Sequence, residues 1–155
     1  MYTIVIADDE TELRQALIRR IDWESVGFQV VGEAENGIEA LELVGKLEPD
    51  LLLTDVRMPF MSGIELAREV REIRPTMQIA FLSGFDDFTY AQQAIQYNII
   101  SYMLKPISSE ELTEELRKIK KKIDERFEEF TEQREEKEQQ NLARFLMPLL
   151  LDSFQ

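Results

Sequence analysis

The chain has 155 residues, enough for one domain with a sizeable core, and its hydrophobic (44%) and charged (32%) fractions are ordinary for a globular protein. The 31 Asp and Glu residues outnumber the 18 Lys and Arg residues, and the net charge of −13 argues against direct binding to nucleic acid or an anionic membrane. The absence of His and Cys excludes imidazole and thiolate metal sites, His-dependent nucleophile systems, disulfides and thiol redox chemistry. Any chemistry must therefore use carboxylates, amines, hydroxyls, backbone groups and hard cations.

The N-terminal segment does not have the pattern of a signal peptide, because no basic residues precede its apolar run and Asp8 and Asp9 end that run. No apolar run approaches the ~18 residues of a membrane span. The nearest candidate, 142–151, contains Arg144 and Pro148. We therefore expect a cytoplasmic protein that does not contact a membrane.

Short apolar runs alternate with helical patterns over the first 122 residues, and this order predicts a parallel sheet with helices on both faces. The predicted strands cover residues 2–7, 28–32, 51–54, 78–82 and 101–104. The first predicted helix carries Leu13, Leu17 and Ile21, and the other four begin near residues 37, 62, 87 and 108. Asn36 is a good cap for the second helix, and Ser62 and Ser108 each precede a Glu by three residues, which is the pattern of a capping box.

The fifth helix is expected to continue beyond the sheet, because residues 108–147 contain neither Gly nor Pro. Such a helix would have about 40 residues and a length of ~60 Å. Ile119, Ile123 and Phe130 fit a heptad seam that Gln133, Lys137 and Gln140 would continue, so the coiled-coil signal is weak. Two interpretations stay open: a solvated helix with a frayed end, or a signalling helix that pairs with a second chain or leads into a further domain.

Chemically useful side chains follow four of the five predicted strands. Asp8 and Asp9 follow the first strand, Asp55 the third, Ser83 the fourth and Lys105 the fifth. In open parallel sheets, ligands bind at the carboxyl ends of the strands, near the point where strand order reverses. The sequence therefore predicts that three acids, a hydroxyl and an amine meet at one edge of the sheet.

The charge of this group predicts its chemistry. Clustered carboxylates repel one another, so a proton or a cation must enter, and oxygen-only ligands suit Mg²⁺. Asp55 is then a candidate nucleophile that forms an acyl phosphate, with Mg²⁺ and Lys105 stabilising the phosphoryl oxygens. The Ser83 hydroxyl would donate to one of these oxygens, and Gly84 leaves room for the phosphoryl group to enter.

These residues, in their local context, closely resemble the receiver domain of two-component response regulators. The motifs that carry the resemblance are Asp8-Asp9, Thr54-Asp55-Val56-Arg57-Met58-Pro59, Gly63, Ser83 and Tyr102-Met103-Leu104-Lys105-Pro106. The resemblance covers residues 1–122. It implies a flavodoxin-like (βα)5 doubly wound parallel α/β sheet with strand order 2-1-3-4-5, followed by a long C-terminal helical extension at 123–155.

The resemblance also implies the roles of the residues around the acceptor. Asp9, Asp55 and the backbone carbonyl of Arg57 are implied as direct Mg²⁺ ligands, with Asp8 reaching the metal through water. Asp55 is implied as the phosphoacceptor and Lys105 as the phosphate-contacting lysine. The resemblance implies a sensor histidine kinase as the phosphoryl donor. Because this chain has no histidine of its own, the phosphoryl group must come from another protein or from a small acyl phosphate.

Ser83 and Tyr102 resemble the switch pair of the family. Phosphorylation adds charge and acceptor oxygens; Ser83 would move toward the phosphoryl group, and Tyr102 would turn inward to fill the vacated space. The change would reshape the surface of the fourth helix, fifth strand and fifth helix and reach the helical extension. Pro59, Gly63 and Pro106 are implied as structural residues, and the bond before Pro106 is often cis in this family.

Three residues beside the acceptor, Arg57, Gly84 and Phe85, are expected to tune access to the site and the rate at which water hydrolyses the acyl phosphate. Further phrases are similar to receivers of AraC-type transcriptional regulators from Gram-positive bacteria. These phrases are Ile21-Asp22-Trp23-Glu24, Val31-Gly32-Glu33-Ala34-Glu35-Asn36-Gly37 and Ser83-Gly84-Phe85-Asp86-Asp87-Phe88. Such regulators bind DNA through a C-terminal module that this chain lacks, so we expect an N-terminal fragment that controls a missing output domain and forms a homodimer.

Other functions remain as alternatives or are disfavoured. The main alternative is a receiver-like dimerisation module that never uses phosphate, which the complete set of site residues argues against. A Mg²⁺-dependent phosphatase of the haloacid dehalogenase type needs Asp-x-Asp, whereas Asp8 and Asp9 are adjacent. A nucleotide site is disfavoured because the turn after the first strand contains no glycine. We expect a phosphoacceptor switch that assists its own phosphotransfer and dephosphorylation, and not an enzyme.

Overall fold

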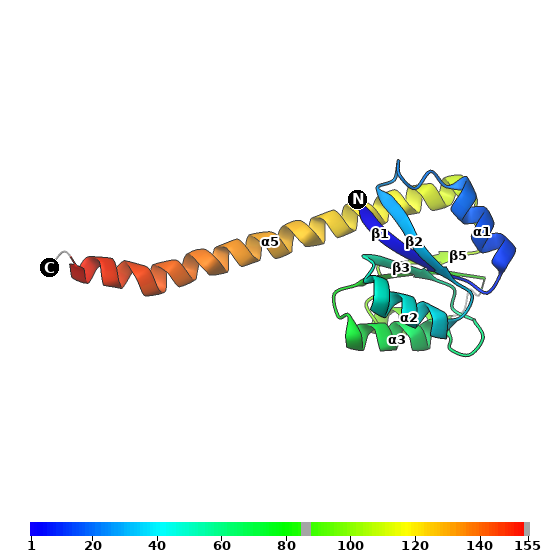
Figure 1. The fold of residues 1–155 in the computed structure, drawn as a ribbon, viewed down its shortest axis with the longest axis horizontal. Helices are drawn as coiled ribbons and strands as arrows, with labels where there is room; N and C mark the ends of the chain where they lie inside the picture. The colour runs from blue at the N-terminus through cyan, green and yellow to red at the C-terminus, as the bar shows by residue number, and fades with distance from the viewer. Residues whose placement is uncertain (85–87, 154–155) are drawn as a thin grey trace. The chain divides into compact units, whose positions relative to one another are not determined.

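The computed structural model describes residues 1–84 and 88–153, and in these residues five strands alternate with five helices (Figure 1). The strands are β1 (Tyr2–Ala7), β2 (Phe28–Ala34), β3 (Leu51–Thr54), β4 (Gln78–Ser83) and β5 (Ser101–Leu104). The helices are α1 (Thr11–Arg20), α2 (Gly37–Leu47), α3 (Gly63–Ile73), α4 (Phe88–Gln96) and α5 (Ser109–Ser153). The predicted alternation of strands and helices is confirmed.

All strands in the described part of the chain form one parallel sheet in the order β2-β1-β3-β4-β5, as predicted. The chain first adds β2 on one side of β1 and then adds β3, β4 and β5 on the other side. The strand order therefore reverses at β1 and β3. The carboxyl ends of these two neighbouring strands are where a ligand site is expected in a sheet of this kind.

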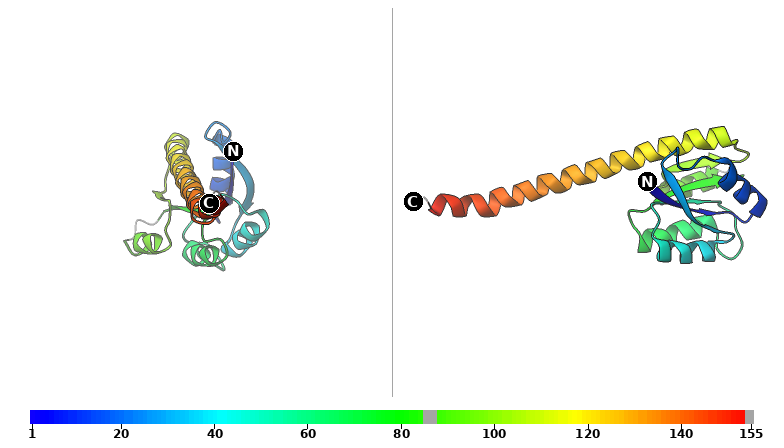
Figure 2. Two further views of the ribbon diagram at one scale, coloured as in Figure 1. Left: turned by 90° about the vertical axis from the view of Figure 1, so that its left-hand side faces the viewer. Right: turned by 45° about the horizontal axis from the view of Figure 1, so that its top comes forward.

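Helices cover both faces of the sheet. The left view of Figure 2 shows α1 and the first turns of α5 on one face, and α2, α3 and α4 on the other. Each parallel strand must connect to the next by a crossover, and right-handed crossovers place successive helices on one face or the other according to the direction in which the sheet grows. This arrangement leaves the carboxyl ends of the strands free to carry a site.

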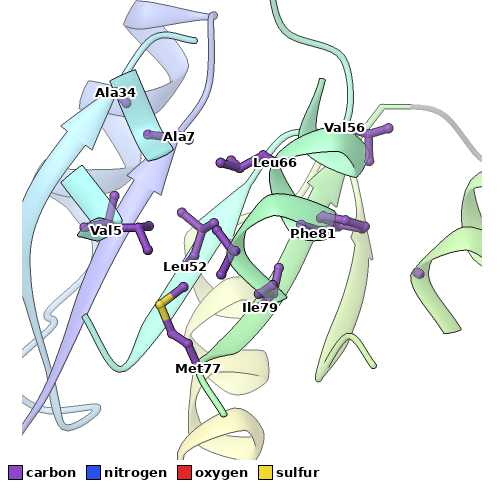
Figure 3. Close-up of a cluster of buried hydrophobic side chains, with 14 residues drawn as sticks. Val5, Ala7, Ala34, Leu52, Val56, Leu66, Met77, Ile79 and Phe81 are labelled. Carbon is purple, nitrogen blue, oxygen red and sulfur yellow. The ribbon is translucent and has the colours of Figure 1, made fainter. Parts of the chain in front are cut away.

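Side chains alternate between the two faces along each strand, so one strand serves two cores. Val5, Leu52 and Ile79 point toward the layer of α2, α3 and α4, where they pack with Leu66 and Phe81 (Figure 3). The neighbouring strand residues supply the opposite face; these are Ile4, Ile6, Leu51, Leu53, Ala80 and Leu82, all buried. Burial on both faces explains why the central strands are continuous apolar runs rather than alternating ones.

Three of the predicted helix starts are confirmed by side-chain caps, whereas Asp87, the predicted start of the fourth helix, lies outside the described residues. Asn36, Ser62 and Ser108 each accept a hydrogen bond from a backbone amide three residues later, at 2.9, 3.1 and 3.1 Å. Each bond satisfies one of the amides that a helix leaves unpaired at its first turn. Two strands run further than predicted, because β2 reaches Ala34 and β4 includes Ser83.

Helix α5 is longer than the predicted 40 residues, with 45 residues from Ser109 to Ser153. The prediction stopped before Pro148 because proline cannot donate the helical hydrogen bond, yet the helix continues past it. The chain divides into two compact units, Met1–Lys120 and Lys121–Gln155. The functional division into a receiver at 1–122 and a linker at 123–155 stays a prediction. Within the described ranges, no helix is long and apolar enough to span a membrane.

Candidate functional site

Three carboxylates from two neighbouring strands meet at the carboxyl edge of the sheet. Asp8 and Asp9 follow β1, and Asp55 follows β3, where Ala7 and Thr54 are paired in register. One carboxylate oxygen from each of the three acids lies within 4.8 Å of the other two. Asp8 and Asp55 are buried, whereas Asp9 is exposed. The predicted acidic cluster is therefore present, with one side open to solvent.

Lys105 joins the cluster from the end of β5. Its ammonium lies 2.8 Å from Asp8 Oδ2 and 2.9 Å from Asp55 Oδ2, and 3.6 Å from Glu10 Oε1. The lysine side chain is only 11% exposed. A single cation thus bridges the two buried carboxylates, which come from different strands, and partly offsets their mutual repulsion.

The backbone fixes the orientation of the two buried carboxylates. Asp55 Oδ1 accepts the Val56 amide at 2.7 Å, and Asp8 Oδ1 accepts the Glu10 amide at 2.9 Å. In both residues Oδ1 is bound to the backbone and Oδ2 faces the Lys105 ammonium. The Asp55 amide donates to the carbonyl of Ala7 at 2.9 Å, which ties the turn after β3 to the end of β1.

The site perturbs the protonation of two of its groups. Burial raises the pKa of Asp8, and the nearby Asp55 carboxylate raises it further, although hydrogen bonds from Lys105 and the Glu10 amide act in the opposite direction. Burial alone would lower the pKa of Lys105, but its bonds to Asp8 and Asp55 outweigh that effect and raise it. Lys105 is therefore held as an ammonium, while the carboxylates beside it carry more negative charge than one cation balances.

The donor set fits a magnesium ion. Three carboxylates with converging oxygens carry three negative charges, against one from the Lys105 ammonium. Oxygen ligands, an uncompensated negative charge and one solvent-exposed side are what Mg²⁺ requires, because it keeps several waters and takes one or two carboxylates. Asp8, Asp9 and Asp55 are the residues that could hold it, and a ligand role for the backbone carbonyl of Arg57 stays a prediction.

The residues predicted to act as a switch lie on β4 and β5. Ser83 is fully buried at the end of β4, and its carbonyl accepts the Lys105 amide at 2.8 Å. Tyr102, on β5, is half-buried and packs edge-on against Phe81, with the ring centroids 6.0 Å apart. The movement of the two side chains stays a prediction.

Two of the three residues that were predicted to tune access to the site lie in the described part of the chain, and both are exposed. Arg57 is exposed in the turn after β3. Gly84 is exposed, and a Cβ built there would meet no heavy atom within 4 Å among the described residues other than its chain neighbours, so open space is available beside it. Phe85 lies outside the described residues.

Gly63 is a structural requirement of the site. A Cβ at Gly63 would lie 2.0 Å from the carbonyl oxygen of Asp55, and the Gly63 amide donates to the carbonyl of Val56 at 2.7 Å. The start of α3 therefore packs directly against the backbone of Asp55, which only glycine allows. The carbonyl of Pro59 accepts the Met61 amide at 2.8 Å inside the same loop. The bond between Lys105 and Pro106 is cis.

Two residues in contact with the site were not predicted. Glu10 lies 3.6 Å from the Lys105 ammonium, and Arg14 donates to the carbonyl of Asp8 at 2.5 Å. Arg14 is buried on α1, three residues before the buried Leu17. A charged residue on the apolar face of a helix was the available signal, but the sequence does not say which group it would contact.

The fold and the site together define a flavodoxin-like domain with an acid cluster and a lysine at the switch point of a parallel sheet. The sequence pattern of the response regulator receiver domain matches residues 4–117. The chain belongs to this family, and the predicted resemblance is confirmed.

Individual relatives agree with this assignment. The chain is 40% identical over 119 residues to the uncharacterized transcriptional regulatory protein YesN of Bacillus subtilis, an alignment that covers 77% of this chain and 32% of YesN. It is 35% identical over 112 residues to the transcriptional regulatory protein HptR of Staphylococcus aureus, covering 72% of this chain and 44% of HptR. The chain thus spans less than half the length of these relatives.

A solved structure extends the comparison to the fold. The receiver domain of AraT, a response regulator from Geobacillus stearothermophilus, superposes with a TM-score of 0.75 at 38% identity, over 81% of this chain and 97% of that domain. The similarity therefore lies in the receiver domain, and the relatives contain further sequence that this chain does not.

Proposed function

We propose that this chain is a phosphorylatable receiver in which Asp55 accepts a phosphoryl group and the modification changes the surface formed by α4, β5 and α5. The observation that carries the proposal is the bridge that Lys105 makes between Asp8 and Asp55, at 2.8 and 2.9 Å. This lysine and the three acids are the complete set that Mg²⁺-dependent transfer to a carboxylate needs.

The geometry suits Asp55 for nucleophilic attack. Its Oδ1 is held by the Val56 amide, so Oδ2, on the Lys105 side, is the oxygen oriented toward the cluster. That oxygen forms a bond to phosphorus while the bond from phosphorus to the donor group breaks, which gives an acyl phosphate and the free donor. The Lys105 ammonium then lies beside the new phosphoryl oxygens and stabilises their charge.

Asp8, Asp9 and Asp55 would hold Mg²⁺ in this scheme. When bound, the ion would offset the negative charge of the phosphoryl group as it approaches the carboxylates. Around it, Asp8 is oriented by the Glu10 amide, and the exposed Asp9 leaves the solvent side open to the donor. Hydrolysis by water returns Asp55 to its carboxylate, so the domain acts as a reversible switch and not as an enzyme with a separate substrate.

The switch is proposed to run through Ser83 and Tyr102. The Ser83 hydroxyl turns toward the phosphoryl oxygens, and Tyr102 fills the space behind it. Tyr102 lines a groove of about 560 Å³. The other lining residues, among them Leu104 and Glu111, come from β5, the start of α5 and the connection between them. A change in the Tyr102 side chain therefore alters a surface on which a partner could distinguish the two states.

For the whole protein we propose a cytoplasmic transcriptional regulator of the AraC type. The phosphoryl donor is a sensor histidine kinase, and DNA binding resides in a C-terminal module outside this chain. The named relatives YesN and HptR are transcriptional regulatory proteins, and this chain covers only 32% and 44% of their lengths. A regulator from Clostridium phytofermentans described as AraC has a similar structure, with a TM-score of 0.70 at 34% identity.

Beryllofluoride, which mimics a phosphoryl group on a carboxylate, tests the proposal. We expect a protein-bound ¹⁹F resonance in the wild type when Mg²⁺ is present, and no such resonance in Asp55→Ala. The matched control is Asp50→Asn, because Asp50 precedes β3 and binds the Thr3 amide at 2.7 Å at the opposite end of the strand. A bound resonance that survives in Asp55→Ala, or that is lost in Asp50→Asn alone, contradicts the proposal.

The second candidate is a receiver-like module that dimerises through α5 without phosphate. One observation favours it: Phe127 and Phe130 are 65% and 62% exposed on α5. Large aromatic side chains one helical turn apart are costly to leave in water and are suited to pairing with another helix. The two candidates are compatible if phosphorylation controls the pairing.

A further inference from the structure

A buried arginine side chain donates a hydrogen bond to the backbone of Asp8, in the acidic cluster. The proposed phosphoacceptor chemistry does not use this arginine. Arg14 lies on α1, and its side chain is 6% exposed. Its Nη1 donates to the carbonyl oxygen of Asp8 at 2.5 Å, and its Nε donates to Glu33 Oε1, on β2, at 3.0 Å. One guanidinium thus connects α1, β2 and the end of β1.

The same residue also holds the other end of the turn that carries the acids. The backbone amide of Arg14 donates to the carbonyl of Glu10 at 2.9 Å. Asp9 lies between the two carbonyls that Arg14 binds. This amide bond is the ordinary first hydrogen bond of the helix, and Glu10 makes no side-chain cap bond there, so the contact that is specific to arginine is the one from its guanidinium to the Asp8 carbonyl.

The geometry points to Arg14 as a positioning residue that orients the Asp8 and Asp9 carboxylates for a divalent cation. The inference rests on the proposed function, because it requires that the acidic cluster takes Mg²⁺. Arginine suits this task because its planar guanidinium presents several donors in fixed directions, and here two of them reach different partners. A lysine would keep the charge but offers a single ammonium that cannot reproduce both contacts in the same geometry.

The sign of the effect separates positioning from simple electrostatics. Arg14 carries a positive charge next to a site that binds a cation, so its removal should tighten Mg²⁺ binding if charge alone matters. If Arg14 holds the acids in place, its removal weakens binding, because residues that orient metal ligands typically change metal affinity by about 10- to 100-fold.

The test compares metal affinity in the wild type, Arg14→Lys and Arg14→Met. Mn²⁺ alone is titrated and followed by electron paramagnetic resonance, with Mg²⁺ as competitor, and urea unfolding is recorded for each variant. We expect the dissociation constant to rise about tenfold in Arg14→Met, with a smaller rise in Arg14→Lys. Equal or tighter binding in the variants that fold overturns the inference. If Arg14→Met does not fold, Arg14→Lys decides by the same criterion.

Arg71 supplies the matched control. Its guanidinium also donates to backbone carbonyls, those of Tyr97 at 2.8 Å and Asn98 at 3.2 Å and that of Met77. These carbonyls precede β5 and β4, at the opposite edge of the sheet from the acids. Arg71→Met should therefore lower stability and leave Mn²⁺ affinity unchanged.

Two further outcomes are distinguishable. If Arg71→Met weakens Mn²⁺ binding as much as Arg14→Met, general destabilisation explains the loss and the inference is wrong. If the wild type itself binds neither Mn²⁺ nor Mg²⁺, the proposed function fails, whatever the variants do. Wild-type binding with unchanged affinity in the Arg14 variants leaves the proposed function intact and removes only the role of Arg14.

Discussion

Asp8 carries its charge in surroundings that disfavour it. The residue is 4% exposed, and burial, together with the charge of Asp55, raises the pKa of its carboxyl group. The Lys105 ammonium at 2.8 Å compensates for only part of this cost. Carboxylates that share a cation site must lie close together. Their mutual repulsion lowers the stability of the folded protein when no cation is bound.

This arrangement has a consequence for stability. The ordinary pKa of Asp8 is 3.8 and the folded value is higher, so above pH 3.8 the unfolded chain loses this proton more readily than the folded protein. The contribution of Asp8 to the free energy of unfolding therefore falls as pH rises from 3.8 through the raised pKa. Asp8→Asn, which stays neutral, should lack this fall and be more stable than the wild type at neutral pH, while it binds Mg²⁺ more weakly.

Urea unfolding midpoints, measured without metal on both sides of pH 3.8 and at neutral pH, check this prediction. Asp22→Asn is the control, because Asp22 is an exposed acid in the α1–β2 connection. The two variants should diverge as pH rises, with Asp22→Asn following the wild type. An Asp8→Asn protein that is less stable than the wild type at neutral pH contradicts the account.

At the residue scale, the sequence predicts the residues of the acidic cluster better than the residues that hold the cluster in place. Asp55 and Lys105 are predictable because each directly follows a strand, and parallel topology brings strand ends together. Arg14 is not predictable in the same way, because its contacts depend on how α1 packs against β2. Helical periodicity places it on the buried side, but it does not specify a backbone carbonyl as its partner.

At the scale of elements, the connection from β3 to α3 determines how closely the start of α3 packs against the backbone of Asp55. Gly63 begins α3, and a Cβ there would lie 2.0 Å from the carbonyl oxygen of Asp55. The helix start therefore contacts the backbone of Asp55 with no room for a side chain. Any larger residue must move the helix or the acceptor.

Gly63→Ala should lower the free energy of unfolding by about 1–3 kcal/mol, the usual cost of forcing extra volume into a packed region. Gly45→Ala is the opposite case, because a Cβ there meets nothing within 4 Å and Gly45 lies inside α2. It should raise the free energy of unfolding by about 0.5–1 kcal/mol, because glycine is a poor helix residue. Urea unfolding measures both changes, and equal effects of the two substitutions would refute the steric account.

Element boundaries were predictable where a local signal exists. Asn36, Ser62 and Ser108 each cap a helix as their sequence patterns indicate, because a cap depends on residues only three positions apart. The end of α5 was not predictable from Pro148, because the helix continues past this residue although a proline inside a helix removes a hydrogen bond and is usually costly. The cost of Gly63→Ala could not be foreseen either, since the contact joins segments eight residues apart in a folded loop.

At the scale of the whole molecule, the second unit, Lys121–Gln155, belongs to helix α5 as far as Ser153. Its sequence is acidic and Glu-rich, and isolated helices of polar composition gain little from burial. Phe127, Phe130 and Leu142 are exceptions among the side chains that the structure describes in this unit, because all three are large, apolar and mostly exposed. We expect these two aromatic residues to be covered by a second copy of the helix.

Phe127→Glu combined with Phe130→Glu should therefore raise the dimer dissociation constant at least about tenfold, a loss of about 1.4 kcal/mol. Sedimentation equilibrium of the full chain with beryllofluoride measures this constant. The control, Gln139→Glu combined with Asn141→Glu, adds the same charge to the same helix at exposed polar positions outside the heptad seam. If the wild type stays monomeric with and without beryllofluoride, or if both double variants weaken the dimer equally, the pairing role of these residues is refuted.

We propose that Asp55 becomes an acyl phosphate in a reaction that depends on the acidic cluster and Lys105. Incubation with acetyl phosphate, followed by intact mass spectrometry and mapping of the modified peptide, tests it most directly. The account predicts a gain of one phosphoryl group on Asp55 with Mg²⁺, no gain when Mg²⁺ is chelated, and none in Asp55→Ala. A phosphoryl group on another residue, or full modification without any divalent cation, would contradict it.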